Sequence, residues 1–220
     1  MAEYAANEDV LRTDLVRTAR RLHELNLSAA ATGNVSVRCG QGYLVTPSGM
    51  DYQSVTVDDL VWLDTDGSMP AGQRRPTSEW RMHVAIYQAR PEFAAIVHTH
   101  SAHATALACL RHEIPAFHYM VTKAGGDNIR CADYATFGTQ TLSNNALQAL
   151  EDRRACLLAN HGLIVAGATL AAALQLAWEV EELARQYCLL LPLGEPVLLD
   201  AEELQRVSAQ FADYGQKNQI

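Results

Sequence analysis

The chain has 220 residues, of which 49% are hydrophobic and 7% aromatic, so it is long and apolar enough for a substantial globular core. The formal net charge of −8 argues against a nucleic-acid-binding protein, which needs clustered Lys and Arg. No long apolar run indicates a membrane helix, and the acidic start MAEYAANEDV lacks the basic and apolar regions of a secretory signal.

The cysteines bear on the cellular compartment. The five are scattered along the chain and form no C-x-x-C pair. This pattern favours reduced thiols over a disulfide framework or a structural zinc site made of thiolates. We therefore expect a soluble cytoplasmic protein without nucleic-acid or membrane partners.

The N-terminal part of the chain predicts one helix and three strands. Apolar residues at helical spacing predict a helix from about Glu8 to Asn26. Two short strands follow, NVSVR (34–38) and YLVT (43–46), and the turn CGQG joins them. LVWLD (60–64) predicts a third strand, which the turn TDGS ends.

The middle of the chain alternates helix and strand. SEWRMHVAIYQAR (78–90) predicts a helix with Ser78 as its N-cap. EFAAIVHTH (92–100) predicts a strand, in which an alternating apolar run leads into the two histidines. SAHATALACLRH (101–112) predicts a helix capped by Ser101.

The C-terminal part of the chain predicts three helices and a pair of strands. TLSNNALQALEDR (141–153) has the pattern of a helix. ACLLANHGLIVAG (155–167) predicts two strands that turn around residues 160–162. A long amphipathic helix is predicted over residues 169–191, and a last helix over about Asp200 to Tyr214.

The order of these elements indicates the fold class. Strands arrive as hairpins with helices between them and do not form strict βαβ repeats. We therefore expect an α/β fold with a mostly antiparallel central sheet covered by helices. No linker-like stretch divides the sequence, so one domain over residues 1–220 is expected.

Three of the eight histidines lie together in IVHTHSAH, where a predicted strand ends. Residues i and i+2 of a strand project from one face, so His98 and His100 point the same way, as two imidazoles that bind one cation must. Catalytic zinc usually has three protein ligands. His161, in a tight loop, and Glu79, at a helix start, are further candidates. A histidine pair without metal is the alternative, and His83 is expected only to be packed or exposed.

Seven motifs give the chain a family resemblance. They are TGNVS, TPSGM, PTSEW, IVHTHSAH, IPAFHYM, AGGDNIRCADYATFGT and NHGLI, and the resemblance covers about Leu11 to Tyr214. In this order they resemble the class II aldolase/adducin family. The resemblance implies a three-layer sandwich and one Zn²⁺ per subunit, held by Glu79, His98, His100 and His161.

The resemblance also implies a substrate site. Glu79 would leave the metal when substrate chelates it and act as a base, and Tyr119 would protonate the aldehyde oxygen from a neighbouring subunit. Phe137 and Tyr214 would line the aldehyde pocket. The residues implied in phosphate binding carry small hydroxyl groups or exposed N–H groups. They are Gly33, Asn34, Ser48, Gly49, Thr77 and Ser78. A homotetramer with active sites at its subunit interfaces is expected.

The implied activity is that of a zinc-dependent aldolase, which reversibly cleaves a ketose 1-phosphate to dihydroxyacetone phosphate and a small aldehyde such as lactaldehyde. L-Fuculose 1-phosphate is the first expected substrate, and rhamnulose, ribulose and 5-deoxypentulose 1-phosphates are alternatives. Two other activities and one non-catalytic role within the family stay open. Sugar-phosphate 4-epimerases carry Asp at the position of Glu79, and methylthioribulose-1-phosphate dehydratases place a glutamate near Tyr119. An adducin-like scaffold lacks the metal ligands.

Overall fold

A computed structural model describes residues 2–29 and 32–213, and its centre is a seven-stranded sheet in the order β3-β2-β1-β4-β7-β6-β5. Five neighbouring pairs are antiparallel and only β5 and β6 are parallel, so the sheet is mixed but mostly antiparallel, as predicted. The strands are β1 (Asn34–Cys39), β2 (Gly42–Val45), β3 (Val61–Asp64), β4 (Ala95–Thr99), β5 (Cys131–Ala132), β6 (Ala155–Leu158) and β7 (Gly162–Gly167).

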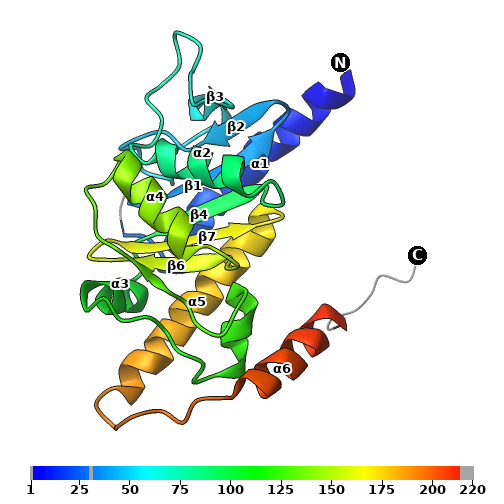
Figure 1. Cartoon of the computed structure of the whole chain (residues 1–220). Coiled ribbons are helices and arrows are strands. Elements are labelled where there is room, and N and C mark those ends of the chain that lie inside the picture. The colour runs from blue at the N-terminus through cyan, green and yellow to red at the C-terminus, as the bar shows by residue number, and fades with distance from the viewer. Residues whose placement is uncertain (1, 30–31, 214–220) are drawn as a thin grey trace.

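Helices cover both faces of the sheet, which gives three layers (Figure 1). The helical elements are α1 (Ala2–Glu24), η1 (Val57–Asp59), α2 (Trp80–Ala89), α3 (Ala102–Cys109), η2 (Tyr119–Ala124), α4 (Gln140–Ala149), α5 (Leu170–Leu190) and α6 (Ala201–Asp213). Helices α1, α3 and α5 pack on one face, and α2 and α4 pack on the other. Among the described helices, none is both long and apolar enough to cross a bilayer.

The two faces of the sheet have separate apolar cores because side chains alternate along each strand. On β4, Val97 enters the core beneath α1 and α5, whereas its neighbour Ile96 enters the core beneath α2 and α4. The same alternation places His98 on the α2 side of the sheet. The central position of β4 therefore brings a histidine between a helix start and the neighbouring strands.

The register of the sheet joins the histidine motif to two other segments. His98 of β4 is paired with Asn34 of β1 on one side and with Ile164 of β7 on the other. β7 begins directly after the turn between β6 and β7, in which His161 lies. Three motifs that are far apart in the sequence thus meet at one end of the central strands.

Two helix starts differ from their predictions in an informative way. Helix α2 begins at Trp80 with Glu79 as its N-cap, so the prediction of Ser78 as cap is wrong. A turn precedes the helix, in which the Thr77 hydroxyl accepts the N–H of Glu79 at 3.4 Å and the Thr77 carbonyl accepts the N–H of Trp80 at 3.2 Å. The N-cap therefore lies one residue later than predicted. Glu79 makes no capping hydrogen bond, so its carboxylate is available for other contacts.

Ser101 is the N-cap of α3 as predicted, but its side chain makes no capping hydrogen bond. A carboxylate from another helix takes that role. Glu181 of α5 accepts the N–H groups of His103 and Ala104, each at 2.9 Å, and also contacts His103 Nδ1 at 2.8 Å. A negative charge at a helix N-terminus is stabilising, so this contact anchors the segment that follows the histidine motif.

The remaining differences concern ends and short elements. Helix α1 begins at Ala2, earlier than predicted, and α3 ends at Cys109, before the predicted His112. The sequence did not indicate η1, η2 or the two-residue strand β5, since such short elements have no measurable period. The hairpin of β6 and β7 and the long helix α5 are confirmed. Tyr214 lies outside the described residues.

Candidate functional site

Four predicted residues meet at one end of the central strands. His98 lies near the end of β4, His100 directly after it, His161 in the turn between β6 and β7, and Glu79 at the start of α2. Their potential ligand atoms all lie within 4.8 Å of one another. His98 Nε2 is 3.0 Å from His100 Nε2 and 2.9 Å from Glu79 Oε2, and His161 Nε2 is 3.2 Å from Glu79 Oε1.

The backbone around these residues brings the rings together. In the turn before β7, Asn160 has a φ of 54°, a left-handed conformation that Asn tolerates better than most residues. The next position but one is Gly162, where a Cβ would collide with the Thr99 carbonyl and come within 3.0 Å of the His100 ring. Glycine therefore allows the turn to approach the end of β4 closely.

The protonation of the histidines suits metal binding. His98 Nδ1 lies 2.9 Å from the Leu163 carbonyl, which can only accept, so Nδ1 donates there and Nε2 is the ring atom that faces Glu79 and the other histidines. Burial, followed by repulsion from His98 and His161, lowers the pKa of His100 to about 4. Burial and then repulsion from His98 lower the pKa of His161 to about 4 as well. Both rings are therefore neutral at pH 7.

The carboxylate in this cluster is ionised. Burial raises the pKa of Glu79, but attraction and a hydrogen bond from His98, attraction from His161 and the amide of Asn34 together bring it well below its usual range. Glu79 Oε1 is buried and has no hydrogen-bond partner among the described residues. An ionised oxygen without a donor, close to neutral imidazole nitrogens, is the arrangement that a bound cation completes.

The donor set fits a zinc ion. Three imidazole nitrogens and one carboxylate oxygen are ligands that Zn²⁺ commonly takes. His98 Nε2 and His100 Nε2 face each other at 3.0 Å, and which of them carries a hydrogen depends on the tautomers of the two rings. With both rings protonated on Nδ1, the two Nε2 lone pairs would be open to a divalent cation, so these residues could hold one.

A cavity of about 370 Å³ opens beside this cluster. All six residues predicted to bind phosphate contribute to its wall, together with Glu79, His100, His161 and Phe137. The six are Gly33, Asn34, Ser48, Gly49, Thr77 and Ser78. No Lys or Arg is present among the described residues of the wall. An anion in this cavity would therefore be bound by N–H and hydroxyl groups and by the N-terminal end of α2.

The phosphate candidates differ in what they can offer. The N–H groups of Ser48 and Thr77 already donate to the carbonyls of Arg75 and Thr46, each at 3.0 Å, so only their hydroxyls can face an anion. Gly33 has a φ of +75°, and a Cβ there would come within 2.6 Å of the His98 carbonyl, so the close approach requires glycine.

Asn34 makes a contact that the sequence did not predict. Its amide nitrogen is 3.1 Å from Glu79 Oε2, and its amide oxygen is 2.5 Å from His83 Nε2. His83 was expected only to be packed or exposed. It is fully buried, and Asn34 forms hydrogen bonds to both His83 and Glu79. The signal that could have found it is its position four residues after Glu79, which places both on one face of a helix. The phosphate role of Asn34 stays a prediction.

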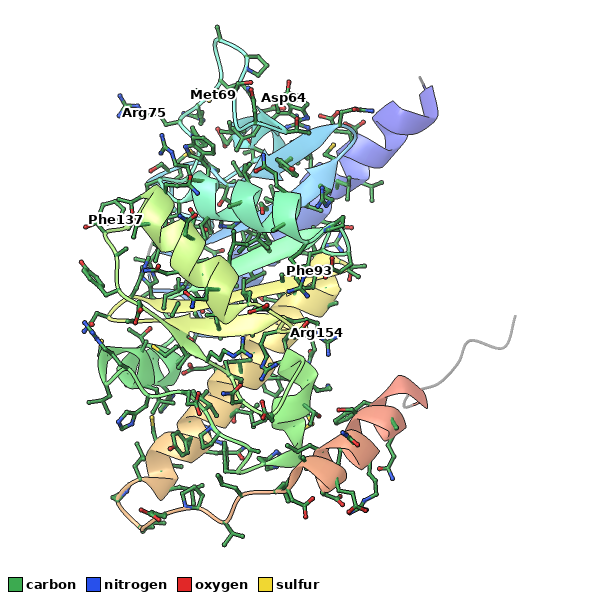
Figure 2. The ribbon with its side chains drawn as sticks, in the orientation of Figure 1. Asp64, Met69, Arg75, Phe93, Phe137 and Arg154 are labelled. Atoms are coloured by element: carbon green, nitrogen blue, oxygen red, sulfur yellow. The ribbon has the colours of Figure 1, made fainter. Side chains whose placement is uncertain are left out.

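The predicted aromatic residues lie in different places. Phe137 is 63% exposed and lines the cavity with Tyr134 and Ala135, on the loop that leads into α4 (Figure 2). Tyr119 is 47% exposed on η2 and does not line this cavity. Its ring stacks against His118 at 4.7 Å and against Phe211 of α6 at 6.0 Å.

Comparison with protein families places these features in a known group. The model of the Class II Aldolase and Adducin N-terminal domain matches residues 13–188. The chain is 50% identical to a 5-methylthioribulose-1-phosphate/5-deoxyribulose-1-phosphate aldolase of Rhodospirillum rubrum, over 96% of this chain and 95% of that protein. It is 44% identical to an L-fuculose phosphate aldolase of Escherichia coli, over 93% of this chain and 95% of that protein.

Solved structures are similar over the same length. An L-fuculose 1-phosphate aldolase matches with a TM-score of 0.88 and 42% identity, covering 92% of this chain and 96% of that one. A putative aldolase/epimerase/decarboxylase from Klebsiella pneumoniae matches with a TM-score of 0.82 and 31% identity, covering 91% and 98%. The mixed sheet between two helical layers is therefore the fold of these proteins.

Proposed function

The chain belongs to the class II aldolase and adducin family and is an aldolase of that class, and from this premise we propose that it is zinc-dependent and reversibly cleaves a ketose 1-phosphate to dihydroxyacetone phosphate and a small aldehyde. The observation that carries the proposal is the convergence of Glu79, His98, His100 and His161 beside a cavity of glycine and hydroxyl residues.

Glu79 is proposed as the base that removes a proton next to the ketone of dihydroxyacetone phosphate. It is ionised and buried, and its oxygen Oε1 has no hydrogen bond among the described residues. A divalent cation held by the three histidines would stabilise the negative charge that forms on the substrate oxygens. Among the described residues no lysine lines the cavity, and Lys123 is 2.6 Å from Glu179, so a Schiff-base lysine has no support there.

The phosphate group is proposed to bind in the same cavity, beside the metal candidates. The hydroxyls of Ser48, Thr77 and Ser78, together with the backbone of Gly33 and Gly49, provide hydrogen-bond donors without positive charge. The start of α2 adds a favourable dipole for an anion. Thr77, Ser78 and Glu79 are consecutive residues of the cavity wall. One short segment of the chain would therefore contact both the phosphate and the reacting carbon.

The aldehyde half of the substrate is proposed to end in an apolar carbon. The wall contributed by Tyr134, Ala135 and Phe137 is aromatic or apolar and carries no charge. A 5-deoxypentulose 1-phosphate, with or without a 5-methylthio group, fits this wall, and so does L-fuculose 1-phosphate with its terminal methyl. The 50% identity to an aldolase named for the first two substrates, against 44% to an L-fuculose phosphate aldolase, supports proposing them ahead of L-fuculose 1-phosphate, the first expectation from sequence.

Tyr119 is proposed to act in the cavity of a neighbouring subunit of a homotetramer. The support is its half-exposed position on η2 and its absence from the cavity wall of its own chain. Replacing Tyr119 by Phe should then spare proton exchange at dihydroxyacetone phosphate while slowing cleavage, and sedimentation should give four chains per particle. A cytoplasmic location and one domain over residues 1–220 stay predictions.

Deuterium exchange into dihydroxyacetone phosphate tests the proposal without knowledge of the aldehyde. The zinc-loaded protein should exchange one hydrogen in D₂O, and chelator-treated protein should not until zinc is restored. Zinc-bound protein without exchange would point to the epimerase or dehydratase activities, and protein that binds no zinc would support the scaffold. Relative kcat/KM for 5-deoxyribulose 1-phosphate, L-fuculose 1-phosphate and ribulose 1-phosphate, whose terminal carbon carries a hydroxyl, then tests the apolar wall.

A further inference from the structure

We propose that His83 is a positioning residue that acts through Asn34 to hold the Glu79 carboxylate in the orientation in which it accepts a proton from the substrate. The inference rests on the proposed function, because it concerns the base of that reaction. His83 does not line the cavity beside the cluster, and its hydrogen bonds among the described residues go to Ser36 and Asn34, so its link to Glu79 passes through the Asn34 side chain.

The geometry begins with two matched rows of side chains. Glu79, His83 and Tyr87 follow one another at intervals of four residues along the start and body of α2. Asn34 and Ser36 are two residues apart and lie on the same face of β1. Four residues of helix advance about 6 Å. Two residues of strand advance about 6.6 Å. Because the two spacings nearly agree, the side chains of the helix and the strand interleave.

Short contacts join the five residues in a continuous line. Asn34 Nδ2 is 3.1 Å from Glu79 Oε2, and Asn34 Oδ1 is 2.5 Å from His83 Nε2. On the other side of the ring, His83 Nδ1 is 2.7 Å from Ser36 Oγ, which is 2.8 Å from the Tyr87 hydroxyl. All five side chains are buried, so water does not compete for these bonds.

The charge on Glu79 determines which way the hydrogens point. A carboxylate can only accept, so the group of Asn34 that faces it is the NH₂ and the group that faces His83 is the oxygen. That oxygen also only accepts. His83 must therefore carry its proton on Nε2, and a neutral ring then leaves Nδ1 as an acceptor for the Ser36 hydroxyl.

The rest of the line follows from the single hydrogen of each hydroxyl. Ser36 uses its hydrogen on His83, so Tyr87 donates to Ser36. Burial, followed by repulsion from His98, lowers the pKa of His83 to about 3, which keeps the ring neutral. Burial raises the pKa of Tyr87, which keeps its proton in place. Every hydrogen in the line therefore points toward Glu79.

This arrangement distinguishes the two oxygens of Glu79. Oε2 faces the amide of Asn34 and also His98 Nε2 at 2.9 Å, whereas Oε1 is buried without a hydrogen bond among the described residues and lies 3.2 Å from His161 Nε2. Oε1 is thus the oxygen better placed to take a proton. Without the N–H of His83, the buried oxygen of Asn34 would lose its donor, so the amide would no longer be held in place and its hydrogen bond to Glu79 would weaken.

Two substitutions at one position test the proposal. In His83→Gln the amide nitrogen can take the place of Nε2, whereas the shorter side chain in His83→Asn ends near the position of Nδ1 and cannot reach Asn34. Ser143→Ala is the matched control, because Ser143 is buried on α4 and bonds only within its own helix, to the Thr139 carbonyl. For each variant, kcat and KM for deuterium exchange into dihydroxyacetone phosphate, zinc content and melting temperature would be measured.

His83→Asn should lower kcat for exchange about ten- to hundredfold, with KM and zinc content unchanged. His83→Gln should recover most of that loss, and Ser143→Ala should leave kcat unchanged. Equal losses in both His83 variants, or losses that appear in KM or in zinc content, would overturn the positioning role. Wild-type protein without exchange would instead overturn the proposed function.

The tautomer of His83 gives a second measurement that does not depend on activity or on a variant. In the ¹⁵N-labelled, zinc-loaded protein, long-range ¹H–¹⁵N correlation spectra should show His83 neutral, with its proton on Nε2. A proton on Nδ1, or a doubly protonated ring at pH 7, would reverse the hydrogen bonds described above and overturn the proposal even if every variant is inactive.

Discussion

The two faces of β1 are buried to the same degree but are packed against very different partners. On one face Val35 and Val37 enter the apolar core beneath α1 and α5. On the other face Asn34 and Ser36 contact His83 and other polar groups of α2. An apolar face contributes stability in proportion to the area that it removes from water, with little demand on direction. A buried polar face is stable only when each donor meets an acceptor, so it specifies geometry.

The difference shows how this fold separates stability from chemistry within a single strand. The alternation in NVSVR is the pattern of a strand with one face in solvent. Helix α2 covers that second face and supplies matched polar partners in place of water. The line of hydrogen bonds ends on Glu79, the proposed base. The apolar face should therefore respond to mutation in stability, and the polar face in activity.

The largest effect is expected at the end of the polar face, in Glu79→Gln. The amide oxygen of glutamine can still accept from Asn34, so the fold should persist. Loss of the base should lower deuterium exchange into dihydroxyacetone phosphate by about 10²- to 10⁴-fold. Circular dichroism and zinc content would be compared with those of the wild type. Exchange at the wild-type rate with zinc bound would remove Glu79 from the role of base.

The next effect is a pH dependence of stability, which is expected from His83 on the polar face of β1 and not from the valines on its apolar face. The pKa of His83 is about 3 in the folded protein, mainly through burial, against about 6.5 when unfolded. The unfolded state therefore binds a proton first, and the contribution of His83 to stability, complete above pH 6.5, is lost as pH falls toward 3. Its slope should reach about 1.4 kcal/mol per pH unit in the free energy of unfolding.

Urea unfolding of chelator-treated protein between pH 7 and pH 4 would measure that slope. The proper comparison is the difference between wild type and His83→Gln, because His100 and His161, whose pKa values are also lowered to about 4, contribute to both chains alike. Parallel curves for the two chains would mean that His83 is not held as a neutral ring.

The sequence brought the four metal candidates to attention but not the contacts that support them, for a physical reason. His98 and His100 are two residues apart, so the local period of a strand already places them together, although His100 lies one residue beyond β4. His161 and Glu79 carried recognisable motifs. The contact of His83 with Asn34 joins residues 49 positions apart. It depends on how α2 lies across β1, which no local pattern describes.

The helix start at α2 was mispredicted for a related reason. Ser78 and Thr77 are both good capping residues, and propensity alone does not choose between them. The Thr77 hydroxyl accepts from Glu79, and the turn that results moves the cap to Glu79. The error of one residue matters, because it places the carboxylate at the helix end rather than within its first turn. The fold class needed only element order, and it was predicted.

On the apolar face, Val35→Ala should lower stability without changing the chemistry. Val35 is fully buried, so the loss of two methyl groups and the cavity left behind should cost about 2 kcal/mol in the free energy of unfolding. Val10→Ala on the exposed side of α1 is the matched control and should cost little. Both should keep wild-type kcat for exchange at 25 °C. A large fall in kcat for Val35→Ala would mean that the two faces of β1 are not independent.

The smallest effect is expected from Tyr87→Phe, at the far end of the polar face. Phenylalanine keeps the ring that stacks on Tyr43 at 4.6 Å, and removal of the hydroxyl takes one donor from Ser36, at a cost of about 1 kcal/mol in stability. Ser36 can still donate to His83, so kcat for exchange should fall far less than in His83→Asn. The hydrogens are oriented from the charged end of the line, and a change should weaken with distance from Glu79. If Tyr87→Phe instead lowers exchange as much as His83→Asn, the tyrosine and not the carboxylate sets the direction of the line.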